Sequence, residues 1–169
     1  MYDETSYRYN NRYLEIQSEK IKYLLKEFRL NSKMLVDLGC GTCILRSFIR
    51  EDIYYIGIDL SINMLKEYKG FKKNTSLIQA DIEHLPLKKD SLNTIFLLTV
   101  IQNLTKIQSW IKEIDQISKN QSLLFISLLK KDENLSDFKE NLKKNMFVLQ
   151  KKLDIKGLED YLLIFKKIN

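Results

Sequence analysis

The chain has 169 residues, which is one domain at roughly 150 residues per domain. Hydrophobic residues make up 44% and charged residues 30%, a composition that excludes intrinsic disorder and collagen. The net charge is +6, and most of it lies in residues 85–169, where 15 basic residues face 10 acidic ones. This bias is compatible with an anionic substrate or RNA, although the lysines occur singly or in pairs, as on an ordinary solvated surface.

Neither the apolar stretches nor the first residues of the sequence point to a membrane. No apolar stretch approaches the roughly 18 residues of a membrane span, and the first residues lack the pattern of a signal peptide. Two cysteines outside a secretory context are typical of reduced thiols. We therefore expect a cytoplasmic protein with no membrane partner.

The predicted elements alternate between helix and strand. An apolar stripe predicts a first helix over residues 12–28, and a short buried strand follows at 34–36. In chain order the pattern then predicts a helix at 44–49, a strand at 53–58, a helix between 61 and 70, a strand at 76–80, a loop at 81–90, a strand at 94–99, a helix at 107–117, a strand at 123–129, a helix near 135–142 and a hairpin of strands at 146–149 and 161–165. Such alternation indicates an α/β fold, with a mostly parallel sheet and helices on both faces.

Acidic residues mark the ends of three of these strands. In parallel sheets, ligands bind beyond the carboxyl ends of the strands. Asp37, Asp59 and Asp81 stand at three of the four exits where we expect a ligand. Gly39 and Gly41, separated by one residue, let the backbone turn tightly and let a ligand lie against it.

The second and third exits complete a pocket for an adenosine. Asp59 lies 20 residues beyond Gly39, where a carboxylate accepts hydrogen bonds from ribose hydroxyls. We expect Asp81 to accept a hydrogen bond from the amino group of adenine, and Ile82 to contact the adenine ring. As alternatives, the glycines could serve only a turn, Asp59 only a helix cap and Asp81 only a loop.

Charge selects among the adenosine cofactors. A dinucleotide needs a third glycine where this chain has Ile44, and its pyrophosphate would face Asp37. Like charges about 4 Å apart cost roughly 4 kcal/mol at an effective dielectric constant of about 20. S-adenosylmethionine has no phosphate and carries an ammonium and a sulfonium, so the same carboxylate attracts it. The charge pattern therefore favours S-adenosylmethionine.

Four segments resemble the motifs of class I S-adenosylmethionine-dependent methyltransferases and follow one another along the chain in the order typical of that family. These are the glycine-rich turn at 37–42, the segment 56–65 with its ribose-binding acid, the segment 80–92, and the opening Tyr2-Asp3 with Tyr9. The last two are similar to the type 11 group, which includes quinone C-methyltransferases. The resemblance implies a Rossmann-like, doubly wound, seven-stranded sheet with an antiparallel C-terminal strand. It also implies a single methyltransferase domain over 1–169, with 1–32 as an N-terminal helical lid and 33–169 as the core.

The resemblance also implies which residues bind the cofactor. They are Asp37, Gly39, Cys40, Gly41, Asp59, Leu60, Asp81, Ile82 and Leu97, with Tyr9, Met64 and Gln102 as weaker candidates. Two family features are missing. Leu92-Asn93 replaces the usual Phe-Asp, and residues 100–104 lack the paired histidines of many members.

The expected reaction is direct displacement at the sulfonium methyl group, which leaves S-adenosylhomocysteine. The protein mainly aligns the two reactants, so we name no catalytic base and no metal. A small molecule is the first choice of acceptor, because the sequence shows no appended nucleic-acid-binding module and its opening resembles that of small-molecule enzymes. Residues 98–100 lack the Asn/Asp-Pro-Pro-Tyr motif of enzymes that methylate adenine, cytosine or glutamine, which argues against those acceptors. RNA or protein is the second choice, and an activating partner subunit is a further alternative. A Cys-x-x-Cys at Cys40 and Cys43 leaves open a dithiol redox protein.

Overall fold

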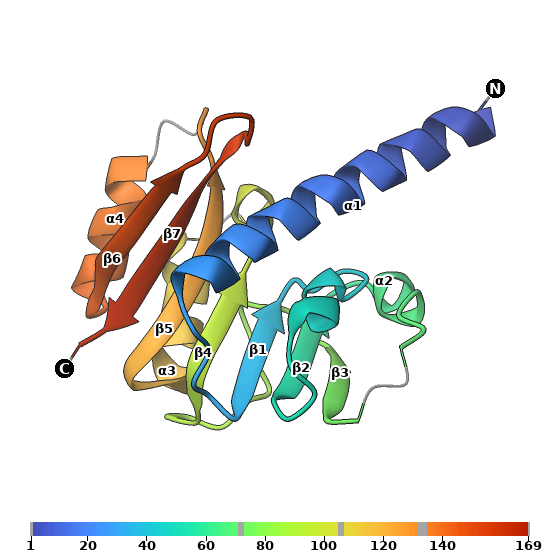
Figure 1. Ribbon diagram of the computed structural model, residues 1–169. Helices are drawn as coiled ribbons and strands as arrows, with labels where there is room; N and C mark the ends of the chain where they lie inside the picture. Colours follow the sequence, from blue (N-terminus) through green and yellow to red (C-terminus); the bar gives the residue numbers. More distant parts are fainter. Residues whose placement is uncertain (1, 71–72, 105–106, 132–134, 169) are drawn as a thin grey trace.

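The computed structural model describes residues 2–70, 73–104, 107–131 and 135–168, and it places one sheet between two layers of helices (Figure 1). The strands are β1 (Met34–Leu38), β2 (Tyr54–Asp59), β3 (Thr75–Gln79), β4 (Leu92–Leu97), β5 (Ser118–Leu129), β6 (Phe147–Asp154) and β7 (Asp160–Lys167). The helices are α1 (Tyr2–Glu27), α2 (Ile62–Lys66), α3 (Ile107–Ile117) and α4 (Leu135–Lys144), with short 3-10 turns η1 (Ile44–Phe48) and η2 (Ile101–Asn103).

The sheet has the expected doubly wound order. Its seven strands lie in the order β3-β2-β1-β4-β5-β7-β6. The first five are parallel to one another, and β7 runs antiparallel to both β5 and β6. The Rossmann-like, mostly parallel architecture is thus confirmed, as is the C-terminal hairpin. Because β1 and β4 are neighbours, the strand order switches direction between them, and this is where such folds bind ligands.

Each face of the sheet carries its own hydrophobic core, because alternate side chains of a strand point to opposite faces. On one face, Val36 and Ile95 pack with Trp110 of α3 and Phe138 of α4. On the other face, β1 and its neighbours pack against α1 and η1. Several of these residues are fully enclosed on the second face: Leu24, Leu35, Tyr55, Phe96 and Phe125.

Two predicted helices differ from expectation, one in its type and the other in its length. The segment at 44–49 forms only η1, which begins after Cys43 in a left-handed conformation (φ 63°) and ends at Ile49 in extended backbone. Arg46 fixes this turn from inside the protein: its guanidinium donates to Thr75 Oγ1 at 2.8 Å and to the Lys73 carbonyl at 3.0 Å. The helix after Ser61 ends at Lys66 rather than near residue 70.

The first helix is longer than the apolar stripe predicted. It begins at Tyr2, and its N-terminal half extends away from the sheet in Figure 1. Its C-terminal half lies against η1, across the side of the sheet where β1 and β4 end. None of the helices in the described ranges is long and apolar enough to cross a membrane.

Candidate functional site

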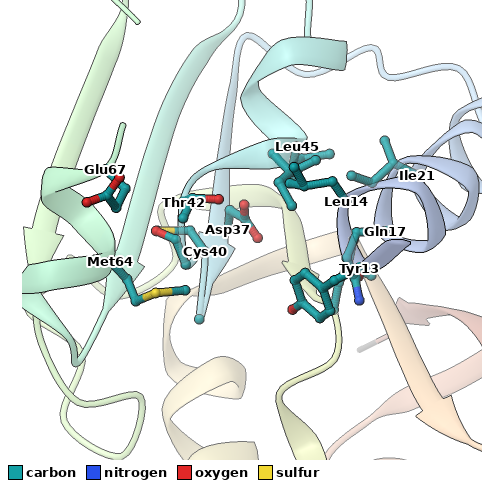
Figure 2. A pocket seen from close by; sticks show the side chains of 14 residues that line it. Tyr13, Leu14, Gln17, Ile21, Asp37, Cys40, Thr42, Leu45, Met64 and Glu67 are labelled. Carbon is teal, nitrogen blue, oxygen red and sulfur yellow. The ribbon is translucent and has the colours of Figure 1, made fainter. Parts of the chain in front are cut away.

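A cavity of about 490 Å³ lies between α1 and the turn that follows β1. This is the carboxyl edge of the sheet, as expected. Figure 2 shows Tyr13 and Gln17 projecting from α1 on one side, and Cys40, Thr42 and Met64 on the other. The remaining lining residues are Leu14, Ile21, Asp37, Gly39, Gly41, Ile44, Leu45, Glu67 and Leu98.

The glycine turn forms the floor of the cavity. Gly39 and Gly41 have φ values of 69° and 53°, in the left-handed region that side chains disfavour. A Cβ on Gly39 would lie 2.4 Å from Val100 Cγ2, so no side chain fits between this turn and the segment after β4. The amides of Gly39 and Cys40 donate to the Ile58 carbonyl at 2.7 and 3.0 Å, which ties the turn to β2.

Asp59, at the end of β2, holds the turn from the side. Its Oδ2 accepts a hydrogen bond from the Gly41 amide at 2.8 Å, and its Oδ1 accepts one from the Ser61 amide at 2.8 Å. Ser61 is also the N-cap of α2, since its hydroxyl accepts from the Met64 amide. The cap of α2 is therefore Ser61, and the Asp59 carboxylate lies beside the glycine turn.

Asp37 is the most perturbed acid of the site. Its carboxylate is 4% exposed and accepts a 2.6 Å hydrogen bond from the Tyr55 hydroxyl. Burial raises the pKa of Asp37 to about 7; the Tyr55 hydrogen bond opposes this shift, and the charge of Asp59 adds to it. Burial and the adjacent carboxylate likewise raise the pKa of Tyr55, so it remains a hydrogen-bond donor.

The charged residues that line the cavity are both acidic. Asp37 and Glu67 line it, and no Lys, Arg or His is among its lining residues in the part of the chain that the structure describes. A phosphate would find no cationic partner here, whereas an ammonium or sulfonium would find two carboxylates. The glycine cradle and this charge pattern therefore fit S-adenosylmethionine and disfavour a dinucleotide.

Only some of the predicted site residues line the cavity itself. Asp37, Gly39, Cys40, Gly41 and Met64 do. Asp59, Leu60, Asp81, Ile82, Leu97 and Gln102 do not. Asp59 and Asp81 nevertheless share the same sheet edge, because Asp59 pairs with Gln79 at the end of β3, two residues before Asp81.

The residues outside the cavity differ in their surroundings. Asp81 is exposed and accepts from the Glu83 amide at 2.9 Å, whereas Ile82 is buried in the core. Leu60 is exposed, and the exposed Gln102 donates to the Thr99 carbonyl at 2.9 Å.

Leu97 is fully enclosed on the α3 face, and it is Leu98, on the opposite face, that lines the cavity. Tyr9 lies on α1, but its side chain falls outside what the structure describes.

Sequence reasoning expected a lid from residues 1–32 but did not name Gln17, Lys20 or Tyr55. Gln17 lines the cavity, and Lys20 lies buried beneath it, 2% exposed. One signal was available: residues 17 and 20 are polar positions within the otherwise apolar stripe of this helix. Tyr55 gave no such signal, since an aromatic residue in a strand is usually core.

The Cys-x-x-Cys forms the end of the glycine turn. Cys40 Sγ and Cys43 Sγ lie 3.6 Å apart, and the two residues are 8% and 1% exposed. The hydrogen bond between the two thiols, together with burial, raises the pKa of Cys40, and the same bond lowers the pKa of Cys43. Reactive dithiols are usually partly exposed and electropositive. These thiols lie instead beside acidic residues in a closed turn.

Comparison with known proteins gives one family. Residues 36–126 match the family model described as "Methyltransferase domain". An uncharacterized protein of Methanocaldococcus jannaschii is 32% identical over 146 residues, covering 86% of this chain and 61% of that relative. The chain thus spans about three fifths of the relative's length.

Solved structures share the fold at low sequence identity. A SAM-dependent methyltransferase from Aquifex aeolicus superposes with a TM-score of 0.75 at 16% identity, covering 88% of this chain and 89% of that one. A complex of the Haloferax volcanii Trm112 methyltransferase activator with a putative methyltransferase gives a TM-score of 0.78 at 15% identity, with 89% of each chain covered.

Proposed function

The chain belongs to the methyltransferase domain family, and from this premise we propose that it methylates a small molecule. Its cofactor is S-adenosylmethionine, which supplies a methyl group on a cationic sulfur. The observation that carries the choice of acceptor is the acidic, cation-free lining of the cavity among the described residues. A polyanion such as RNA finds no phosphate partner there, so the acceptor group that enters is uncharged or cationic.

We assign the cofactor residues by what each can contribute. The backbone of Gly39 and Gly41 provides a surface without side chains, against which the cofactor can lie. Asp37 offers a carboxylate to the cationic end of the cofactor. Asp59 offers its oxygens to the ribose hydroxyls, and Asp81 and Ile82 extend the site toward the base. The protein's contribution to the rate is then alignment of two bound reactants.

Calorimetry tests cofactor binding. We expect the purified chain to bind S-adenosylhomocysteine with micromolar affinity. Asp59→Ala should weaken binding at least tenfold, because a charged acceptor contributes roughly 1.5–3 kcal/mol per hydrogen bond. Asp52→Ala is the matched control, since Asp52 is an exposed acid paired with Arg50. Absence of heat for wild type would refute the proposal.

A labelled methyl donor incubated with fractionated cell extract tests the acceptor class. We expect the label in small molecules. Label in RNA would favour the alternative raised by the basic second half of the chain, where 15 basic residues face 10 acidic ones. A chain that binds the cofactor without any transfer would favour an activating partner subunit, the arrangement named for the Haloferax volcanii neighbour.

A further inference from the structure

A buried polar network lies beneath α1, next to the cavity. Lys20 Nζ lies 2.6 Å from Asp160 Oδ2 and donates to Thr99 Oγ1 at 3.1 Å. Thr99 Oγ1 in turn lies 2.9 Å from Gln17 Oε1. The network joins α1, the segment after β4 and the start of β7, and only Gln17 lines the cavity.

The number of hydrogens that each group can donate fixes the direction of these hydrogen bonds. An ammonium can only donate, so Thr99 Oγ1 accepts from Lys20. The single hydrogen of the hydroxyl then goes to the nearest acceptor, Gln17 Oε1, since Ser127 Oγ is farther away at 3.4 Å. The amide oxygen of Gln17 is thereby used within the protein. Its NH2 group has no partner among the described residues and is left for the cavity.

The backbone of Thr99 is held in an unusual conformation. Its φ is 59°, which a β-branched residue rarely adopts. Ser127 Oγ accepts from the Thr99 amide at 2.7 Å, and Gln102 donates to the Thr99 carbonyl. Strained backbone of this kind persists only where the surrounding structure over-determines it, and it is frequent at ligand sites.

The surroundings of Gln17 are apolar. The α1 end of the cavity is lined by Leu14, Ile21 and Leu45, with Tyr13 beside Gln17 (Figure 2). The apolar residues Ile44 and Leu98 also line the cavity. Asp37 and Glu67 lie toward the glycine turn. An oriented hydrogen-bond donor set in an apolar wall selects a ligand that is apolar and carries one accepting atom.

We propose that Gln17 is the acceptor-recognising residue, whose amide NH2 donates to an oxygen of an uncharged, largely apolar methyl acceptor. This inference rests on the proposed function and refines it. Thr99 and Lys20 are positioning residues, because they act only by holding the Gln17 amide in one orientation. A carboxylate-bearing acceptor is disfavoured, since the cavity already holds two acidic groups.

Three small probes test this assignment on the full chain loaded with S-adenosylhomocysteine. Acetophenone has a neutral carbonyl, α-methylstyrene replaces that oxygen with a CH2 of the same shape, and benzoate carries a negative charge. Titration followed by 1H–15N NMR gives each affinity and follows the Gln17 NH2 signals. A neutral hydrogen bond is worth about 1 kcal/mol, so acetophenone should bind roughly fivefold more tightly than α-methylstyrene, and benzoate most weakly.

The variants separate recognition from structure. Gln17→Leu should remove the preference for acetophenone while keeping S-adenosylhomocysteine binding, and Gln150→Leu, on the exposed side of β6, is the matched control. Thr99→Val should shift the Gln17 NH2 signals and reduce the preference, and Thr99→Ser should restore both.

Each contrary outcome is distinct. An acetophenone preference that survives Gln17→Leu, tighter binding of benzoate, or no response of the Gln17 NH2 signals to any probe would overturn the assignment. Failure to bind S-adenosylhomocysteine would instead overturn the proposed function on which it rests.

Discussion

Affinity for S-adenosylmethionine should rise steeply with pH because of Asp37. The pKa of this buried carboxyl is about 7 in the empty protein, so it is mainly neutral at pH 6 and mainly ionised at pH 7.5. From that value the ionised fraction rises from about 0.09 to about 0.76. If the cationic cofactor binds only the ionised form, its dissociation constant falls about eightfold over this interval.

Calorimetry at the two pH values, in buffers of matched ionic strength, measures the effect directly. Asp37→Asn is the control, because an amide oxygen still accepts from Tyr55 but does not titrate in this range. The groups that face Asp37 are Tyr55, Asp59, Cys40 and Cys43. A wild-type affinity that is flat with pH, or an equally steep profile in Asp37→Asn, would refute the reasoning.

Four further outcomes follow. The pKa of Asp37 is raised on folding, so its contribution to stability is present below pH 3.8 and is lost as pH rises through 7. In urea titrations without ligand, the free energy of unfolding should fall by about 2 kcal/mol between pH 5.5 and 8, and Asp37→Asn should abolish this fall. Asp59→Ala should loosen the glycine turn, seen as faster hydrogen exchange of the Gly41 amide; unchanged exchange would contradict the role of its Oδ2. Gly39→Ala should lower the melting temperature, because its Cβ would meet Val100 at 2.4 Å; a neutral effect would show that this contact relaxes. Lys20→Met should cost about 3–5 kcal/mol in urea denaturation by leaving a buried carboxylate uncompensated, and a loss below 1 kcal/mol would contradict this.

The sequence predicted the architecture because its signals were local and periodic. The apolar spacing of residues 107–117 matches α3 residue for residue. The 3-10 conformation of η1 and the short length of α2 could not be predicted in the same way. The residues 44–49 have helical spacing, but the left-handed Cys43 and the burial of Arg46 are tertiary features, and they restrict the segment to a single 3-10 turn.

The site was predictable where it lies on the sheet. Strand exits place Asp37 and the glycine turn at one edge by topology alone, and these residues do line the cavity. A lid from residues 1–32 was expected, but its lining residues could not be chosen, because nothing local says across which strands a helix packs. Leu97 and Leu98 show a second limit: since side chains alternate along a strand, Leu97 packs on the α3 face while its neighbour Leu98 lines the cavity.

The buried guanidinium of Arg46 has a consequence for how the cavity behaves when empty. The Arg46 guanidinium donates hydrogen bonds to both the Lys73 carbonyl and Thr75 Oγ1. These bonds connect the segment after the glycine turn to the residues that lead into β3. One wall of the cavity therefore keeps its shape before any ligand arrives. On the opposite wall, the side-chain entropy lost on binding should fall on Tyr13 and Leu14 of α1, which are each 42% exposed, and not on the buried Gln17.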